Sequence, residues 1–517
     1  MVESIVDLLR SQAAKTPDQL AAIVDGISQI TYGEWGRLSN RLGRKLAGLG
    51  LEKGDRVALL FNNAEAVSFM VGYFAVHKAG GVIVPINTRL AAGEISYILS
   101  NSEAVGALGE ASVAAKLEAA RKNAPCVRWA ALKGAGGELD LDELLKDGDD
   151  SEFAIPCAAD DLCDILYTSG TTGFPKGVAC THGDVISLGG SGGLDKMFGG
   201  RAFLHAVPLF TFAGTHAMMM TPLKAGMTSI IQPRFDAGRF LALIEQHKVV
   251  LSYAVPSMIV LALQHPDIET HDYSSLQMLM YGTAPMPPEA VRKLGEICPK
   301  TMLLNVYGLT EGGGAACSLP PFEAKKRPGS IGRPLPGTEL KIITEEGNEA
   351  APNEVGEIRM RGKHRRRYFN NEEASSDTWT EDGWLKTGDL GYLDEDGYLY
   401  ISGRNKDMII RGGFNVYPVE IEAALHEHPE ILEVAVIGVP HDVLGEDIKA
   451  CIVARPGANL SEDDIAKFCE DRLADYKRPR QIEFMAELPR NALGKVLKRS
   501  LRGGSDDQSG TGLAAEA

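Results

Sequence analysis

An apolar stretch between two short apolar runs constrains the fold most strongly. Residues 57–61 (Val-Ala-Leu-Leu-Phe) and 82–86 (Val-Ile-Val-Pro-Ile) have the length of buried strands, and residues 64–79 between them have the length of a helix. Gly80 and Gly81 follow the helical stretch as a stop signal. This order predicts a strand, a helix and a second strand, and such units build parallel sheets.

Similar apolar runs recur further along the chain, and nearly all of them end in Gly, Pro, Ser or Thr clusters. Open α/β sheets bind ligands just beyond the carboxyl ends of their strands, so we expect these clusters to line a ligand site. The predicted strands are residues 164–167, 249–255, 276–281 and 302–307.

The character of the chain changes near residue 400, where residues 394–403 give a polar turn, a short strand and a break. The 517 residues are enough for more than one domain. We predict an α/β protein with a large N-terminal domain of αβ sheets (1–405), a small α+β C-terminal domain (407–502) and a disordered tail (503–517). In the small domain we expect helices at 418–425 and 461–473 and strands at 434–439 and 449–454.

Charge and cysteine usage exclude several classes of protein. The chain has 53 Lys and Arg against 69 Asp and Glu, a net charge of −16, which argues against nucleic-acid binding. Its eight cysteines contain no CxxC pair, which indicates reduced thiols in a cytoplasmic protein and no structural metal. The N-terminus lacks the pattern of a signal peptide. Residues 64–79 contain Glu65 and His77 and are too short for a membrane span, so we expect no integral membrane segment.

The strongest chemical signal is a loop rich in Gly, Ser and Thr that directly follows a predicted strand. Glycines let backbone amides approach an anion, hydroxyls add donors and a lysine adds charge, so the loop suits a polyphosphate. It is not a Walker A loop, which would need Gly in place of Pro175 and Ser or Thr in place of Gly177. The candidate phosphate-binding residues are Thr168, Ser169, Gly170, Thr171, Thr172, Gly173 and Lys176.

With six later patterns in order, this loop resembles the adenylate-forming superfamily of acyl-CoA synthetases, adenylation domains and luciferases. The resemblance covers about residues 5–501. It implies that ATP converts a small-molecule carboxylic acid to an acyl-AMP with release of pyrophosphate, and that CoA then takes the acyl group. The patterns are residues 281–285 (Tyr-Gly-Thr-Ala-Pro), 307–311 (Tyr-Gly-Leu-Thr-Glu), 387–389 (Thr-Gly-Asp), 403–407 (Gly-Arg-Asn-Lys-Asp), 412–418 (Gly-Gly-Phe-Asn-Val-Tyr-Pro) and 489–495 (Pro-Arg-Asn-Ala-Leu-Gly-Lys).

The resemblance assigns catalytic roles to three residues. A carboxylate is a poor electrophile, and forming the mixed anhydride with AMP moves negative charge around the α-phosphate, so cations and donors must be aimed there. Lys495 matches the lysine that bridges the acid and the α-phosphate, and Thr310 matches a hydroxyl that contacts this phosphate. Glu311 matches the carboxylate that binds Mg²⁺, and one carboxylate with substrate phosphates is a usual magnesium arrangement.

The resemblance also implies the residues around the nucleoside and CoA. Asp389 would accept from the ribose hydroxyls, with Arg404 near the ribose and phosphate. Tyr307, Gly308 and the segment of Thr283, Ala284 and Pro285 would flank adenine. Gly412 and Gly413 would line a pantetheine tunnel, although a hairpin turn explains them equally. Lys477 would meet CoA phosphates or be an ordinary solvated lysine, and Lys406 would be the hinge about which a mobile small domain rotates.

Two departures from the family pattern bear on the acid. Thr211 stands where relatives usually have a gating histidine, and His216 lies five residues later, able to compensate only in part. Residues 361–369 are shorter and more basic than the usual apolar stretch. We interpret this segment as a solvated patch, with contact to an anionic partner or membrane surface as the alternative.

The implied acyl pocket is apolar and small, with no arginine to pair a second carboxylate. A dicarboxylate is therefore disfavoured, and three glycines after Glu311 leave room for a bulky acid. We expect a hydrophobic monocarboxylic acid of the medium- or long-chain fatty, aromatic or alicyclic type. The predicted pocket residues are Thr211, Phe212, Tyr253, Met258, Gly282, Gly312 and Gly313, with Met218, Thr283 and Gly314 beside them.

Other readings stay open. A stand-alone enzyme that loads a carrier protein shares the first half-reaction, and a non-catalytic acyl or nucleotide sensor would keep the fold without turnover. The sequence also leaves open whether the chain forms a homodimer.

Overall fold

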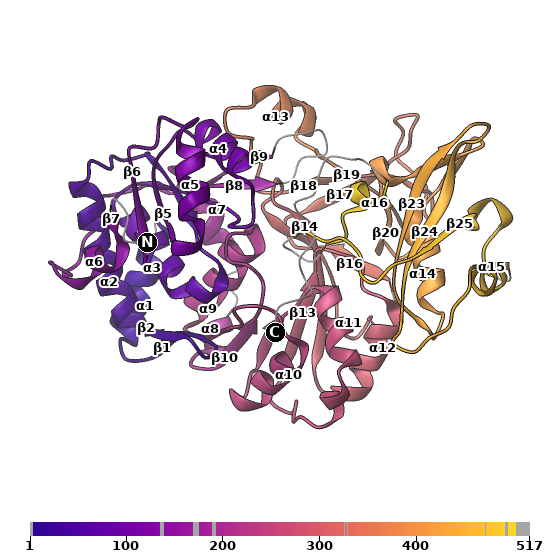
Figure 1. Ribbon diagram of the computed structural model, residues 1–517, viewed down its shortest axis with the longest axis horizontal. Coiled ribbons are helices and arrows are strands. Elements are labelled where there is room, and N and C mark those ends of the chain that lie inside the picture. The colour runs from indigo at the N-terminus through magenta and orange to yellow at the C-terminus, as the bar shows by residue number, and fades with distance from the viewer. Residues whose placement is uncertain are drawn as a thin grey trace.

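The structure is a computed structural model that describes residues 4–134, 139–168, 175–188, 193–324, 326–327, 329–470, 472–491 and 495–502. The predicted tail at 503–517 and the loop residues Ser169, Gly170, Thr171, Thr172 and Gly173 lie outside these ranges. Three sheets organise the described chain, and helices pack around them (Figure 1). The α/β class predicted from the sequence is confirmed.

The first sheet has seven strands in the order β7-β6-β5-β3-β4-β8-β9. Its central strands β3 and β4 are parallel and flank helix α3, so the predicted strand–helix–strand unit is confirmed. The hairpin β8–β9 closes one edge and carries the phosphate loop at its tip. The strands are β3 (Arg56–Leu60), β4 (Val82–Pro85), β5 (Ala104–Glu110), β6 (Trp129–Lys133), β7 (Leu139–Asp140), β8 (Leu162–Thr168) and β9 (Lys176–Thr181).

The second sheet has thirteen strands in the order β17-β18-β19-β20-β16-β15-β14-β13-β12-β10-β11-β1-β2. Strands β10 to β14 run parallel, whereas β15 to β20 are antiparallel. Its strands are β1 (Leu20–Val24), β2 (Ser28–Thr31), β10 (Ala202–His205), β11 (Thr228–Ile231), β12 (Leu251–Tyr253), β13 (Met278–Gly282), β14 (Met302–Leu309), β15 (Gly314–Leu319), β16 (Ser330–Pro334), β17 (Glu339–Ile343), β18 (Gly356–Arg361), β19 (Leu385–Leu393) and β20 (Leu399–Arg404).

The third sheet lies at the opposite end of the molecule from the first in Figure 1. It is separate from the large sheet, because β20 ends at Arg404 and β21 begins at Ile409. The 3₁₀ turn Asn405–Asp407 between them contains Lys406, so the predicted boundary falls in a linker, and independent movement of the two parts stays a prediction. The strands are β21 (Ile409–Arg411), β22 (Phe414–Val416), β23 (Ile431–His441), β24 (Gly445–Ala454) and β25 (Gln481–Phe484).

Amphipathic helices cover the sheets. The helix predicted from Ser461 begins as expected, because the Asp464 amide donates to the Ser461 hydroxyl. It is described as far as Glu470, and the predicted residues 472–473 lie outside it. None of the described helices combines the length and apolar character needed to cross a membrane. The helices are α1 (Ile5–Lys15), α2 (Tyr32–Gly48), α3 (Ala66–Lys78), α4 (Ala92–Asn101), α5 (Ala114–Arg121), α6 (Leu141–Lys146), α7 (His182–Ser187), α8 (Leu194–Phe198), α9 (Met220–Ala225), α10 (Ala237–Gln246), α11 (Pro256–Gln264), α12 (Pro288–Ile297), α13 (Glu372–Thr378), α14 (Pro418–His426), α15 (Glu462–Glu470) and α16 (Lys498–Leu501), with a π-helix at Ala213–Met219.

A buried carboxylate ties the first sheet to the π-helix. Asp164 on β8 is fully buried and accepts hydrogen bonds from His216 Nε2 at 2.6 Å and from the Tyr73 hydroxyl at 2.8 Å, while His77 Nε2 lies 3.3 Å away. Burial alone would raise the pKa of Asp164, but the hydrogen bonds from His216 and His77 outweigh it and hold the pKa below its usual range. The carboxylate therefore stays charged.

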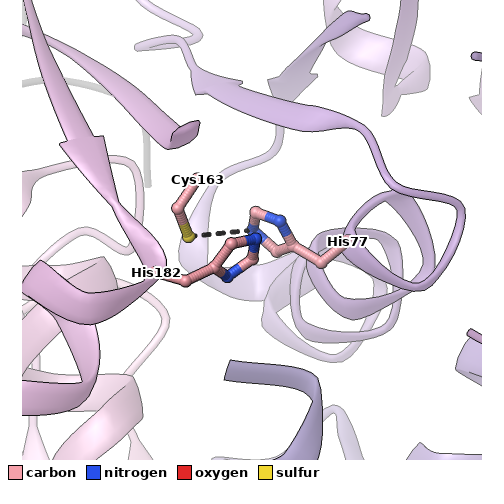
Figure 2. A group of neighbouring side chains, drawn as sticks. All are labelled: His77, Cys163 and His182. Carbon is pink, nitrogen blue, oxygen red and sulfur yellow. Dashed lines mark hydrogen bonds between the residues drawn. The ribbon is translucent and has the colours of Figure 1, made fainter. Parts of the chain in front are cut away.

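Beside it, Figure 2 shows His77, Cys163 and His182, whose ligand atoms all lie within 4.8 Å of one another. The contacts of these three side chains are explained better by hydrogen bonding than by metal binding. His77 Nε2 faces Asp164, and His182 Nδ1 accepts from the Ile5 amide at 3.5 Å. Burial raises the pKa of the Cys163 thiol and lowers the pKa of His182 to about 4, so both are neutral near pH 7. We interpret the group as part of the buried polar core.

Replacing Asp164 by Ala should destabilise the fold strongly. The substitution leaves the Tyr73 hydroxyl and the His216 ring buried without their acceptor, and breaking a buried charged pair costs about 3–5 kcal/mol. Urea unfolding followed by circular dichroism measures the loss, with the exposed neighbour Asp160→Ala as the matched control. Equal unfolding midpoints for both variants would contradict the role of this carboxylate.

Candidate active site

The base of the phosphate loop is ordered around Glu311. Thr168 and Lys176 pair across the β8–β9 hairpin, directly below the loop. The Thr168 hydroxyl donates to Glu311 Oε1 at 3.4 Å, and the Tyr368 hydroxyl donates to the same oxygen at 2.9 Å. Lys176 Nζ lies 5.2 Å from the centre of the Tyr368 ring. The structure thus brings the described ends of the loop to the candidate magnesium carboxylate.

Thr310 and Glu311 lie in the turn that joins β14 to β15. Gly313 has φ +87° and Gly314 has φ +106°, a left-handed backbone in which a side chain would be strained. Glu311 offers one carboxylate beside the Thr168 hydroxyl, a donor set of oxygens that suits Mg²⁺. These residues fit the implied cation.

A second cluster centres on Asp389, which is nine-tenths buried. Asp389 Oδ2 accepts from the Tyr307 hydroxyl at 2.7 Å, and Arg404 Nε lies 3.1 Å from Oδ1. Asp389 and Arg404 are opposite each other on β19 and β20, so the sheet register itself sets their contact. Burial and the neighbouring Asp389 carboxylate raise the pKa of Tyr307, which keeps its hydroxyl protonated.

Lys495 lies close enough to this cluster to interact with it electrostatically. The Lys495 side chain is partly exposed. The surrounding protein still excludes enough water to lower the pKa of Lys495 to about 8, and repulsion from Arg404 also lowers this pKa. The pKa of Lys406 is lowered for the same two reasons. Because the residues come from positions 389 to 495, the C-terminal segment contributes directly to the site.

The segment predicted to flank adenine is conformationally strained. Thr283 follows β13 with φ +71°, which is unusual for a β-branched residue. Such strain persists where surrounding structure imposes it and is frequent at functional sites. A Cβ on Gly282 would lie 2.2 Å from the Val306 carbonyl oxygen, and one on Gly308 would lie 1.7 Å from the Gly314 carbonyl oxygen. Both glycines are therefore required by close strand packing. Ala284 and Pro285 follow Thr283 in the same connection.

Gly412 and Gly413 form the turn of the β21–β22 hairpin, with φ +58° and +85°. The hairpin explanation of these glycines therefore holds, and their contact with pantetheine stays a prediction. Phe414 at the end of this turn is exposed and stacks on Tyr476 with ring centres 4.7 Å apart. Lys477 follows Tyr476 and donates to Glu420 Oε1 at 2.6 Å. The structure places these candidate CoA residues side by side.

Thr211 caps the start of the π-helix. Its hydroxyl donates to the Pro208 carbonyl at 2.8 Å and accepts from the Gly214 amide at 3.0 Å. His216 is fully buried and bound to Asp164, and its partial compensation for a gating histidine stays a prediction.

The predicted pocket residues divide into two groups. Tyr253 and Met258 pack together with Met218 in one cluster, and Ala213 and Ala217 on the π-helix pack against it. Gly282 joins this group, since a Cβ there would lie 3.8 Å from the Tyr253 hydroxyl. Sequence reasoning missed the two alanines. Their spacing of four residues next to the Thr211 segment is the signal that could have found them.

In the second group, which contains Phe212 and the glycines after Glu311, neighbouring side chains fill most of the space. Phe212 and Tyr368 pack against the buried residues of the β8–β9 hairpin, a different cluster from that of Tyr253. A Cβ on Gly313 would meet His364 at 2.7 Å, and one on Gly314 would meet Phe212 at 3.0 Å. The expectation that the three glycines leave room is therefore wrong for Gly313 and Gly314. Gly312 has its nearest neighbour in Leu385, at 3.1 Å from such a Cβ.

The basic segment at 361–369 is not uniformly solvated. Arg365 and Arg367 are exposed as predicted, but Arg366 is only 3% exposed. Its guanidinium lies 5.4 Å from the centre of the Phe212 ring. The interpretation as a solvated patch is therefore wrong for Arg366, and an arginine does lie beside a predicted pocket residue. Sequence alone missed this because alternate residues of an extended segment face opposite sides.

Family models match most of the chain. Residues 9–367 match the model for AMP-binding enzymes, and residues 420–495 match the model for the AMP-binding enzyme C-terminal domain.

Several relatives are similar over nearly their full length. A long-chain-fatty-acid–CoA ligase of Mycobacterium tuberculosis is 37% identical, covering 96% of this chain and 97% of the relative. A feruloyl-CoA synthase of an Amycolatopsis species is 34% identical, covering 95% and 96%. The crystal structure of the anthranilate CoA ligase AuaEII with anthranoyl-AMP superposes with a TM-score of 0.88 at 30% identity and covers 97% of both chains. The chain therefore belongs to the AMP-binding enzyme family, as an ATP-dependent acid–CoA ligase that acts through an acyl-adenylate.

Proposed function

We propose that this ligase activates a bulky hydrophobic monocarboxylic acid, of the fatty, aromatic or alicyclic type, and that Lys495 and the turn of Thr310 and Glu311 carry out adenylation. The relatives named for long-chain fatty acids, ferulate and anthranilate support the fatty and aromatic part of this range. The acyl end of the site is the cluster of Tyr253 and Met258 with Ala213 and Ala217.

One observation carries the proposal. The ribose candidate Asp389, its partners Tyr307 and Arg404, and the catalytic candidate Lys495 gather at one place although they come from distant parts of the sequence. A buried carboxylate with a free lone pair on each oxygen can accept two ribose hydroxyls. A lysine beside it reaches the α-phosphate side of the same nucleotide. The arrangement suits AMP better than any other ligand of similar size.

The chemistry follows from these positions. The acid's carboxylate oxygen attacks the α-phosphorus, and the bond to pyrophosphate breaks. Lys495, Thr310 and Lys176 supply positive charge and donors where negative charge develops. Mg²⁺ bound at Glu311 would neutralise the phosphates of ATP. The thiol of CoA then attacks the acyl carbon, its proton is lost, and the leaving group AMP retains the bridging oxygen.

The second half-reaction needs a different set of groups at the same acyl carbon. Lys406 lies in the linker between β20 and β21, where rotation of residues 407–502 would withdraw Lys495. The same rotation would bring in the β21–β22 hairpin with Phe414, Tyr476 and Lys477. We infer that this hairpin face meets CoA after adenylation.

Cellular location and assembly belong to the same proposal. All eight cysteines are unpaired, and six of them are buried, which supports work in a reducing compartment such as the cytoplasm. A homodimer stays a prediction, and light scattering of the purified protein tests it.

The proposal is tested by incubating the protein with ATP, Mg²⁺, CoA and a panel of fatty, aromatic and alicyclic acids. Mass spectrometry then measures AMP, acyl-AMP and acyl-CoA together. AMP with acyl-CoA from a hydrophobic monocarboxylic acid supports it. Acyl-AMP without thioester would favour a carrier-protein loader, and binding without either product would favour a sensor. Turnover of dicarboxylates alone would contradict the proposed acid class.

The pH dependence of adenylation should follow the ionisation of the Lys495 side chain. In the free enzyme its pKa is about 8, so the lysine loses its charge as the pH rises through 8, and kcat/KM should fall over that range. Pyrophosphate release between pH 6 and 10 measures the profile. In Lys495→Arg the residual activity should lack this fall, because arginine stays charged. An alkaline limb at the same pH in both proteins would assign it to another group.

Lys406→Pro should separate the two half-reactions. Proline fixes φ and removes the amide donor, so it stiffens the linker against rotation. We expect pyrophosphate release within about threefold of the unchanged protein and thioester formation lowered at least tenfold. Quenched-flow assays of each half-reaction measure both rates. Full overall turnover in this variant would contradict the assignment of Lys406 as the hinge.

Ala217→Phe should shrink the acyl pocket. The larger ring would occupy space beside Tyr253 and Met258, so KM for the bulkiest accepted acids should rise about tenfold or more while that for short acids changes little. Met258→Ala should act in the opposite direction. Steady-state assays across a series of chain lengths measure the change, and an unaltered size preference in both variants would place the pocket elsewhere.

A further inference from the structure

The segment that contains the three consecutive arginines runs beside β9, where Val178 and Tyr368 form an isolated antiparallel bridge. The Ala179 amide donates to the Arg367 carbonyl at 2.9 Å, and the Phe369 amide donates to the Gly177 carbonyl at 2.7 Å. In extended backbone, side chains alternate between two faces. Arg365 and Arg367 accordingly face solvent, and Arg367 pairs with Glu372. Arg366 and Tyr368 face the protein interior.

Arg366 and Tyr368 both contact the turn that carries the adenylation candidates. Arg366 Nη1 donates to the Thr310 carbonyl at 3.1 Å, and its backbone amide donates to the Glu311 carbonyl at 3.3 Å. Tyr368 completes the contact through its hydroxyl, at 2.9 Å from Glu311 Oε1. The segment of Arg366 and Tyr368 therefore holds two successive carbonyls and one carboxylate of the turn.

On its other sides the guanidinium has an ion-pair partner and an aromatic ring, although its Nε and Nη2 make no hydrogen bond to the described residues. Nε lies 3.6 Å from Asp184 Oδ2, and the face of the Phe212 ring covers the group at 5.4 Å. Asp184 also accepts from His364 Nδ1 at 2.6 Å and from the Thr181 amide at 2.9 Å. Asp184 belongs to helix α7, so Arg366 connects the turn to a helix of the first sheet.

A buried arginine has a cost that an apolar residue would not have. Removing a guanidinium from water is unfavourable unless its donors and its charge find partners. The simplest explanation is that Arg366 only neutralises Asp184. Charge neutralisation does not explain the hydrogen bond to the Thr310 carbonyl, because the ion pair uses Nε, whereas Nη1 donates to the turn.

We propose that Arg366 is a positioning residue that holds the turn of Thr310 and Glu311 in its adenylation geometry. This inference rests on the proposed roles of Thr310 and Glu311. Without the guanidinium, the Thr310 carbonyl loses its donor, and the turn keeps only its contacts with the Arg366 amide and the Tyr368 hydroxyl, so Thr310 in particular is held less firmly. Groups that orient ligating and catalytic residues in this way contribute about 10–100-fold to affinity or rate.

The test compares Arg366→Met with the matched controls Arg365→Met and Arg367→Met in the full-length protein. Hydrogen exchange measured by mass spectrometry follows a peptide spanning residues 308–315, and pyrophosphate release and thioester formation from supplied acyl-AMP are measured separately. We expect amide exchange in this peptide to be at least tenfold faster in Arg366→Met and adenylation to be about 10–100-fold slower. Thioester formation should stay within threefold, and both controls should match the unchanged protein.

A double variant separates positioning from charge compensation. Asp184→Asn combined with Arg366→Met removes both members of the ion pair, so it also protects against misfolding caused by an unpaired Asp184. Positioning predicts fast exchange and slow adenylation in the double variant as well. Recovery of both values would show that Arg366 only neutralises Asp184 and would overturn the inference. Unchanged exchange and adenylation in Arg366→Met would overturn it equally.

The two readouts also distinguish this inference from the proposed function. If the unchanged protein forms no acyl-AMP from any acid, the proposed function fails, whereas the exchange data still report whether Arg366 holds the turn. If the unchanged protein is active and Arg366→Met behaves identically, only the positioning role is lost.

Discussion

The carboxylate of Asp389, held between the Tyr307 hydroxyl and Arg404, is the interaction on which the site depends. It joins β14, β19 and β20 near the point where the large sheet ends. A charge buried in this way is stable only if its partners stay in place. The bonds therefore fix the orientation of Arg404, the last residue before the linker, and with it the position from which the C-terminal segment extends.

A second buried carboxylate, that of Asp164, also joins segments that are distant in the sequence. Asp164 connects β8, which leads into the phosphate loop, with the π-helix that borders the acyl cluster. Asp184 and Arg366 add a third link, between α7 and the turn of Thr310 and Glu311. Each link joins segments that are far apart in the sequence. The segments proposed to bind the nucleotide and the acid are thus joined through charged groups inside the protein as well as through apolar packing.

Much of this architecture could be predicted from the sequence. Short apolar runs such as 57–61 and 82–86 are buried on both faces, so their length alone indicates parallel strands. The motif residues Asp389 and Arg404 were recognisable because their order along the chain follows the family. What the sequence did not reveal were contacts set by side-chain direction. Arg366 and Arg367 are neighbours in the chain, yet one is buried and the other exposed. Gly313 and Gly314 suggested space that His364 and Phe212 fill.

In the proposed reaction, the acid's own oxygen bonds to the α-phosphorus of ATP. The most direct measurement uses an accepted acid labelled with ¹⁸O in its carboxylate, followed by mass spectrometry of the products. Attack on the α-phosphorus leaves the bridging oxygen with the nucleotide when CoA cleaves the acyl bond. We expect AMP that contains one ¹⁸O atom per acyl-CoA formed. Unlabelled AMP, or label in inorganic phosphate with release of ADP, would show that the acid does not attack the α-phosphorus.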